Sequence, residues 1–99
     1  MIDVNGKVVM ISGANRGIGL AIARSLYKAG YSLSLGSRNI SSLENLIENS
    51  SDDRILNCHF DAMDKSTHTE WVRHTIDKFN KIDCLINNAG IVESVSVED

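Results

Sequence analysis

The sequence predicts an α/β fold in which a parallel sheet carries helices on both faces. Strand-like and helix-like stretches alternate along the 99 residues, and this alternation is typical of βαβ units. A glycine-rich turn joins the first strand to the first helix. Right-handed crossovers then place the four strands in the order 3-2-1-4, with the sheet truncated after the fourth strand. We therefore expect a single domain or a piece of one.

Composition excludes several classes of protein. The chain is 42% hydrophobic and 23% charged, close to the average for soluble proteins, so disorder is not expected. A formal net charge of -3 argues against a nucleic-acid or anionic-membrane surface, which needs clustered Lys and Arg. Neither a membrane-spanning apolar run nor a signal-peptide pattern is present, so we expect a cytoplasmic protein.

The four predicted strands are short and apolar, and they cover residues 7–12, 31–37, 54–60 and 82–86. Cys58 and Cys84 fall within the last two of these strands. We expect both thiols to be buried, because a free cysteine behaves as a small hydrophobe. They would lie on opposite edges of the sheet, too far apart for a disulfide. Neither the cysteines nor the three histidines have metal-ligand spacing, so no metal site is predicted.

The first predicted helix begins at Gly17 and ends before Gly30, which occupies the position of a C-cap glycine. Its expected apolar face consists of Ile18, Ile22, Leu26 and Ala29. A second, short helix is predicted over residues 41–50, opened by Ser41 or Ser42. Its apolar face would contain Leu43, Leu46 and Ile47.

A third helix is predicted over residues 65–79, with Ser66 or Thr67 as its N-cap. Helical spacing places Val72, Ile76 and Phe79 on its apolar face. Beyond the fourth strand, "SVED" at 96–99 has the form of a helix start. A ragged terminus explains it equally simply, but we favour a fourth helix that begins here.

The turn "SGANRGIG" from Ser12 to Gly19 has the composition of an anion-binding loop. Glycines let the backbone approach a phosphate, and the first N–H groups of the following helix have no partner within the helix. Gly13 would permit the tight turn, Gly17 the approach to a pyrophosphate, and Gly19 the packing of helix against strand. A glycine-rich string alone is a weak signal, but the strand before it and the helix after it favour a dinucleotide site.

The end of the second strand bears on the choice of dinucleotide, because such folds contact the adenosine ribose about 20 residues beyond the glycines. Ser37 and Arg38 stand there, without the carboxylate that would accept from the ribose of NAD. Arg38 can hold a 2′-phosphate with its planar guanidinium, and Arg16 in the glycine turn supplies a second cation. These residues favour NADP over NAD.

With "NNAG" at 87–90, the turn "SGANRGIG" resembles the amino-terminal half of the short-chain dehydrogenase/reductase family. The family pattern is T/S-G-x-x-x-G-x-G after the first strand and N-N-A-G after the fourth, and the resemblance covers almost the whole chain. It implies that residues 1–99 are a partial NAD(P)-binding Rossmann domain. Asp61 would accept from the adenine amino group, although an Asp that caps a turn explains it about as well. The cofactor-binding residues implied are Gly13, Asn15, Arg16, Gly17, Ile18, Gly19, Ser37, Arg38, Asp61, Ala62, Asn88, Ala89 and Gly90.

Members of this family transfer a hydride between the nicotinamide and a carbonyl or alcohol, with a Y-x-x-x-K pair beyond the fifth strand. Tyr27 and Tyr31 are the only tyrosines, and neither is followed by Lys four residues later. The chain therefore holds no predicted catalytic residue and is expected to be inactive alone. Two interpretations remain: the cofactor-binding half of a homo-oligomeric oxidoreductase, or a non-catalytic NADP(H)-binding module or assembly partner. The first also predicts exposed apolar side chains on strands one and four.

Overall fold

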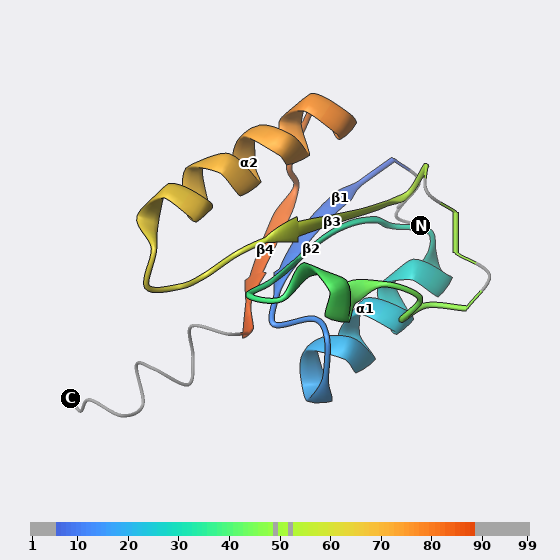
Figure 1. Cartoon of the computed structure of the whole chain (residues 1–99). Coiled ribbons are helices and arrows are strands. Elements are labelled where there is room, and N and C mark those ends of the chain that lie inside the picture. The colour runs from blue at the N-terminus through green and yellow to red at the C-terminus, as the bar shows by residue number, and fades with distance from the viewer. Residues whose placement is uncertain (1–5, 49, 52, 89–99) are drawn as a thin grey trace.

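The computed structural model describes residues 6–48, 50–51 and 53–88. Its sheet contains the strands β1 (Val8–Ser12), β2 (Ser32–Ser37), β3 (Ile55–His59) and β4 (Cys84–Asn87). All paired strands are parallel, and their order is β3-β2-β1-β4 (Figure 1). The predicted order is confirmed. Because the strands are parallel, the carboxyl ends of all four lie along one edge of the sheet.

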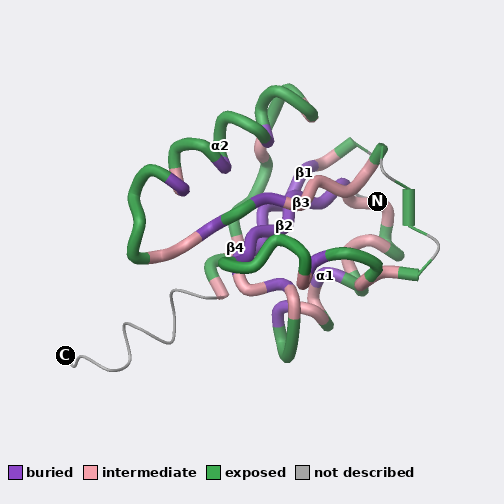
Figure 2. The backbone as a smooth tube through the Cα atoms, viewed as in Figure 1, coloured by how far each residue is buried: buried purple, intermediate pink, exposed green. Residues whose placement is uncertain are grey.

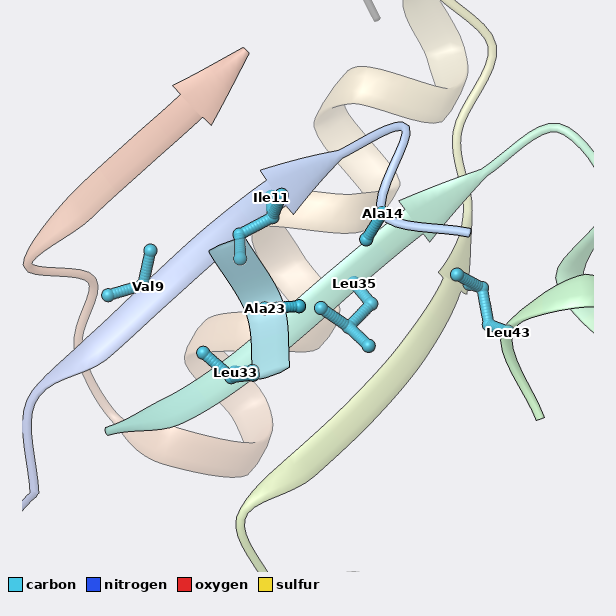
Figure 3. Close-up of a cluster of buried hydrophobic side chains, with 7 residues drawn as sticks. All are labelled: Val9, Ile11, Ala14, Ala23, Leu33, Leu35 and Leu43. Atoms are coloured by element: carbon cyan, nitrogen blue, oxygen red, sulfur yellow. The ribbon is translucent and has the colours of Figure 1, made fainter. Parts of the chain in front are cut away.

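The two faces of the sheet carry different helices. One face packs against α1 (Gly17–Ala29) and the short 3-10 helix η1 (Ile40–Leu43), and the other packs against α2 (Lys65–Phe79). The first cluster of buried side chains comprises Val9, Ile11, Ala14, Ala23, Leu33, Leu35 and Leu43 (Figure 3). The second comprises Met10, Cys58, Phe60 and Trp71. Alternate residues of the central strands thus serve the two faces, as the pleat requires. The two central strands, β1 and β2, are buried along their whole length (Figure 2).

Helix α1 begins at Gly17 and ends at Ala29 as predicted. Gly30 adopts the left-handed conformation with φ of 110°, and its N–H reaches the carbonyl oxygens of the last turn, so the predicted C-cap is confirmed. The predicted apolar face is confirmed in part, because Ile22 and Leu26 pack against the first cluster. The fully buried residues of α1 are Gly19 and Ala23, and Ile18 is 72% exposed. The exposure of Ile18 follows from the close packing of Gly19 against the glycine turn, described below. Ala29 is also exposed.

The predicted helix over residues 41–50 is wrong. Among the described residues of this range only η1 forms. Its N-cap is Asn39, whose side chain accepts from the Ser41 N–H, in place of Ser41 or Ser42. Asn45 then adopts a positive φ of 60°, which a continuing right-handed helix cannot contain. The three apolar residues predicted to share a face nevertheless reach the first cluster from this irregular segment: Leu43, Leu46 and Ile47.

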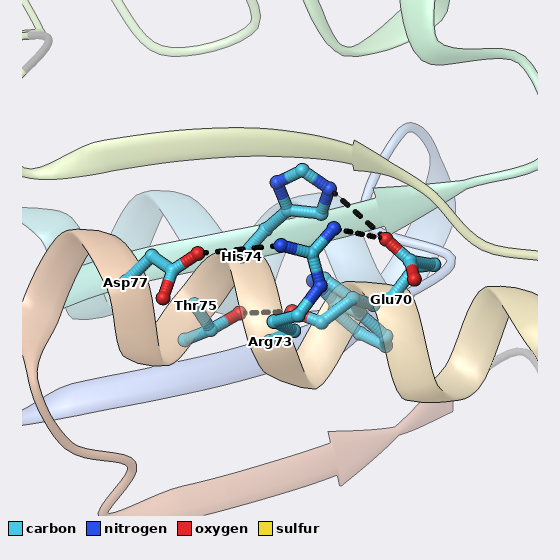
Figure 4. A network of polar contacts seen from close by, with 6 residues as sticks. Glu70, Arg73, His74, Thr75 and Asp77 are labelled. Atoms are coloured by element: carbon cyan, nitrogen blue, oxygen red, sulfur yellow. Dashed lines mark hydrogen bonds and ion pairs between the residues drawn. The ribbon is translucent and has the colours of Figure 1, made fainter.

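Helix α2 has the predicted bounds, but its cap and buried face differ from the prediction. Asp64 is the N-cap in place of Ser66 or Thr67. Thr67, Trp71 and Thr75 are buried, while the predicted Val72 and Ile76 are 45% and 42% exposed. Threonines can occupy the buried face because their hydroxyls have partners there, as the bond from Thr75 Oγ1 to the Trp71 carbonyl shows (Figure 4).

The outer face of α2 carries charged side chains. The Arg73 guanidinium pairs with Glu70 and lies 3.6 Å from Asp77 Oδ2, and His74 Nε2 lies 3.6 Å from the same Glu70 carboxylate (Figure 4). These side chains are half or more exposed. Exposed pairs of this kind contribute little to stability, so we assign them a solvated surface role.

Strand β4 is more exposed than the buried strand that the sequence predicts. Cys58 is buried as expected, but Cys84 is exposed, because β4 pairs on one side only among the strands that the structure describes. Neither forms a disulfide. Leu85 is 57% exposed, as expected for strand four, whereas the apolar residues of β1 are all buried, contrary to expectation. No helix among the described residues is long and apolar enough to cross a membrane.

Candidate functional site

The glycine turn lies at the carboxyl edge of the sheet, between β1 and α1. Gly13 has a positive φ of 67°, which gives the tight turn predicted for it. Its N–H donates to the Gly36 carbonyl across 2.9 Å, so the turn is tied to the end of β2. A β-carbon at Gly19 would lie 2.3 Å from the Gly13 oxygen and 2.9 Å from Asn88 Nδ2. Gly19 thus lets α1 pack closely against the glycine turn and Asn88. The sequence predicts packing against the strand instead.

The amino end of α1 is open to a ligand. Gly17 has φ of 61°, and a β-carbon built on it meets nothing within 4 Å. Arg16 is the N-cap in extended conformation, no side chain caps the helix, and its first turn contains no acidic residue. In α2, by contrast, Asp64 accepts from the first-turn Ser66 N–H. Free N–H groups beside open space fit a phosphate, which the helix dipole also favours.

Asparagines at the end of β4 complete this edge. Ser12 Oγ donates to Asn87 Oδ1 across 3.0 Å, which ties the ends of β1 and β4. Asn88 Nδ2 donates to the Gly13 carbonyl across 3.3 Å and so holds the backbone of the glycine turn against the end of β4. The role of Asn87 was missed by sequence reasoning, although the parallel pairing of Ser12 with Asn87 predicts their contact. Ala89 and Gly90, and the "SVED" segment, lie outside the described residues.

Arg16 and Arg38 follow the carboxyl ends of neighbouring strands. Arg16 lies in the turn after β1 and Arg38 directly after β2, and both residues are exposed. Within the part of the chain that the structure describes, neither guanidinium forms an ion pair or a hydrogen bond. Ser37, just before Arg38, is buried, and its hydroxyl accepts from the Asn39 N–H and meets Ser42 Oγ. The two cations are thus free to meet an anion.

Asp61 stands at the turn that follows β3. Its Oδ1 accepts from the Met63 N–H across 2.9 Å, so this carboxylate does cap a turn. Its own N–H donates to Thr67 Oγ1 at the start of α2. Ala62, beside it, packs against the second cluster. These contacts account for the position of Asp61 and leave its suggested contact with adenine as a proposal.

A βαβ unit with a glycine turn and an uncapped helix at the carboxyl edge of a parallel sheet defines a dinucleotide-binding fold of Rossmann type. Residues 7–99 match the model of the short chain dehydrogenase family, and the chain belongs to this family. The predicted resemblance is therefore confirmed.

Relatives and solved structures agree with this assignment. The chain is 43% identical to agropine synthesis reductase of Rhizobium rhizogenes over 91 residues, which are 92% of this chain and 21% of that protein. A short chain dehydrogenase of Bacillus anthracis superposes with a TM-score of 0.78 at 31% identity, over 85% of this chain and 35% of the other. A 3-ketoacyl-(acyl-carrier-protein) reductase of Brucella melitensis, solved with NADH, superposes with a TM-score of 0.76 at 26% identity, over 84% and 34%. The chain spans from 21% to 44% of the length of such curated relatives.

Proposed function

We propose that this chain is the cofactor-binding half of a cytoplasmic, NADP-preferring oxidoreductase that transfers a hydride between NADP(H) and a carbonyl or alcohol. One observation carries the cofactor choice: two exposed guanidinium groups, on Arg16 and Arg38, follow adjacent strand ends and have no partner among the described residues. The family membership supports an oxidoreductase. The substrate and the homo-oligomeric assembly would belong to a longer protein.

The residues of this chain would bind and orient the dinucleotide, whose nicotinamide carries the hydride. The open first turn of α1 at Gly17 would receive the pyrophosphate. Arg38 and Arg16 would hold the 2′-phosphate with charge-assisted hydrogen bonds. Asp61 would accept from the adenine amino group. Asn88, with Ala89 and Gly90 after it, would back the adenosine ribose.

The absence of a carboxylate after β2 favours NADP over NAD. In NAD-binding folds of this type an acidic residue there accepts from the ribose 2′-hydroxyl. Here Ser37, Arg38 and Asn39 follow one another, and the first acidic residue is Glu44, beyond η1. The Brucella melitensis reductase was solved with NADH, which supports a nicotinamide cofactor in this fold. The preference for the phosphorylated form rests on the residues of this chain.

The second candidate function is a non-catalytic NADP(H)-binding module or assembly partner. The positions of the two tyrosines favour this second function for the 99-residue chain taken by itself. Tyr27 is in α1, where its hydroxyl accepts from the Ser51 N–H and Arg54 stacks on its ring at 3.9 Å. Tyr31 precedes β2, at the opposite edge of the sheet from the glycine turn. Neither lies at the carboxyl ends of the strands, where the dinucleotide would bind, so we expect no carbonyl reduction by this chain with NADPH. The nucleotide sequence past the Asp99 codon discriminates the two: a Y-x-x-x-K motif favours the enzyme, and an immediate terminator favours the module.

The cofactor choice is tested by reversing the charge at Arg38. Arg38→Asp should remove a phosphate contact and supply an acceptor for a 2′-hydroxyl, so that the variant loses its NADPH preference or prefers NADH. Lys28→Asp is the matched control, because Lys28 is exposed in the last turn of α1, far from the glycine turn. Titration calorimetry measures both affinities. An unchanged preference in Arg38→Asp, or an equal loss in Lys28→Asp, contradicts the proposal.

A further inference from the structure

The backbone on both sides of Arg38 is held, although its guanidinium is free. The Ser37 carbonyl accepts from the Phe60 N–H across 2.9 Å. The Asn39 N–H donates to Ser37 Oγ across 3.3 Å. The Arg38 carbonyl oxygen lies 3.0 Å from Nδ1 of His59. Thus Arg38 combines a fixed backbone with a side chain that reaches into solvent.

The same loop is tied further along the chain. Asn39 Oδ1 accepts from both the N–H and the hydroxyl of Ser41, across 3.2 and 2.7 Å. Ser42 Oγ donates to the Asn39 carbonyl across 2.6 Å and meets Ser37 Oγ at 3.2 Å. These bonds lie within residues 37–42. The bond from His59 is different, because it joins the Arg38 carbonyl to another strand.

The ring of His59 must donate this bond, because a carbonyl oxygen only accepts. The neutral tautomer with a proton on Nδ1 can donate, and so can the imidazolium. Parallel pairing of β2 with β3 sets Ser37 opposite His59, which brings the ring to the residue after Ser37. His59 is itself exposed, so its contact with the Arg38 carbonyl contributes little to the core. Its main effect is on the position of the loop at Arg38.

We propose that His59 is a positioning residue for cofactor choice, and that it fixes the backbone of Arg38 so that the guanidinium is oriented toward the 2′-phosphate of NADP. This inference rests on the proposed function. Orienting a cation before binding lowers the entropy that binding costs. His59 itself touches no part of the cofactor in this account. A histidine that binds the phosphate directly is the competing explanation.

The two explanations differ in a double-mutant cycle on the 99-residue chain. Affinities for NADPH and NADH are measured by calorimetry at fixed pH and salt in His59→Leu, His59→Asn, Arg38→Ala and the double variant His59→Leu/Arg38→Ala. NADH serves as the folding control, because it lacks only the 2′-phosphate. His74→Leu is the matched control, since His74 is an exposed histidine on α2.

We expect His59→Leu to weaken NADPH roughly two- to ten-fold, the range for a net hydrogen bond, with NADH unchanged. His59→Asn should restore NADPH affinity, because its amide nitrogen is attached to Cγ like Nδ1 of histidine. In the Arg38→Ala background, His59→Leu should have no further effect. His74→Leu should leave both affinities unchanged.

The inference is overturned, with the proposed function left intact, by no effect of His59→Leu, by no rescue by Asn, or by an undiminished effect in the Arg38→Ala background. The last would show direct binding of phosphate by His59. If Arg38→Ala itself leaves NADPH affinity unchanged, both the inference and the proposed cofactor choice fail. A loss of NADH affinity equal to that of NADPH in His59→Leu would show a general structural role, and would also overturn the inference.

Discussion

Gly19 and Gly13 approach so closely that a β-carbon at Gly19 would lie 2.3 Å from the Gly13 carbonyl oxygen. The same β-carbon would lie 2.9 Å from Asn88 Nδ2, and Asn88 donates to that Gly13 oxygen. Helix α1, the glycine turn and the end of β4 therefore meet at this one position. The geometry of the proposed phosphate site depends on it.

Gly19→Ala should lower the free energy of unfolding by about 1–3 kcal/mol, the usual cost of overpacking. The added β-carbon would clash with a backbone carbonyl, so the backbone of the glycine turn would have to shift to relieve the clash. The measurement is urea unfolding followed by circular dichroism. Ser25→Ala is the control, because Ser25 is exposed on the same helix and such substitutions usually change stability by less than about 0.5 kcal/mol. Equal stability of Gly19→Ala and the wild-type chain would contradict the close packing.

Ser34→Ala should also destabilise the chain. Trp71 Nε1 donates to Ser34 Oγ across 2.8 Å, and Ser34 Oγ lies 2.7 Å from Thr75 Oγ1. All three residues are buried, so removal of the Ser34 hydroxyl leaves the indole N–H without a partner. Such a loss costs about 1–3 kcal/mol.

Trp71 is the only tryptophan, so its fluorescence reports both the unfolding transition and the local change. Thr69→Ala, exposed on the same helix, should leave both the stability and the emission spectrum unchanged. A Ser34→Ala variant with wild-type stability would show that water satisfies the indole.

Asp64 should make stability depend on pH in the acid range. Hydrogen bonds from the Ser66 hydroxyl, and then from the Ser66 N–H, lower the pKa of the Asp64 carboxyl below its ordinary value of 3.8. A carboxyl whose pKa is lower in the folded state stabilises that state above its unfolded pKa. This contribution is lost as pH falls from about 4 through the folded pKa.

The measurement is the melting temperature between pH 7 and pH 2.5. Asp64→Asn keeps an oxygen to cap α2 but cannot titrate, so its decline below pH 4 should be shallower. Ser25→Ala, which changes no titratable group and lies exposed on α1, should decline like the wild-type chain. The account is wrong if Asp64→Asn follows the wild-type curve throughout.

The 99-residue chain should associate in solution. Val72, Ile76 and Leu85 are 45%, 42% and 57% exposed, and β4 has a hydrogen-bonded neighbour on one side only among the described strands. Exposed apolar groups and an unpaired strand edge promote association. We expect oligomers in light scattering at micromolar concentration and binding of a dye that reports apolar surface.

Leu85→Lys should reduce both signals, because it places a charge on the edge strand. Ser25→Lys is the control, since it adds the same charge at an exposed position of α1 without removing apolar surface, and it should leave both signals unchanged. A monodisperse wild-type monomer that binds no dye would show that this surface is not adhesive.

The strands, their order and the glycine turn could be predicted because each has a local signature. Short β-branched runs, right-handed crossovers and the glycine spacing can all be used for prediction without information about distant contacts. The faces of the helices could be predicted only in part: Ile22 and Leu26 of α1 pack against the first cluster as predicted, but Ile18 does not. Ile18 is exposed because α1 must present Gly19 to Gly13, and that demand comes from the turn and β4, far along the chain.

Segment 41–50 shows the same limit. Leu43, Leu46 and Ile47 have helical spacing, yet Asn39 and Asn45 set the local backbone by capping and by a positive φ. Short polar side chains compete with helical hydrogen bonds. For α2, the hydrogen-bond partners of the Thr75 hydroxyl lie on β2 and in the preceding turn of the helix itself. The burial of this threonine therefore cannot be predicted without knowing how the helix packs on the sheet.

The most direct test of the central claim compares NADPH with NADH on the intact 99-residue chain by titration calorimetry. Charge-assisted hydrogen bonds are worth about 1.5–3 kcal/mol, so Arg16 and Arg38 predict roughly ten- to a hundred-fold tighter binding of NADPH. The difference should shrink as salt rises, since both guanidinium groups are exposed. Equal affinities, or tighter binding of NADH, would contradict the account.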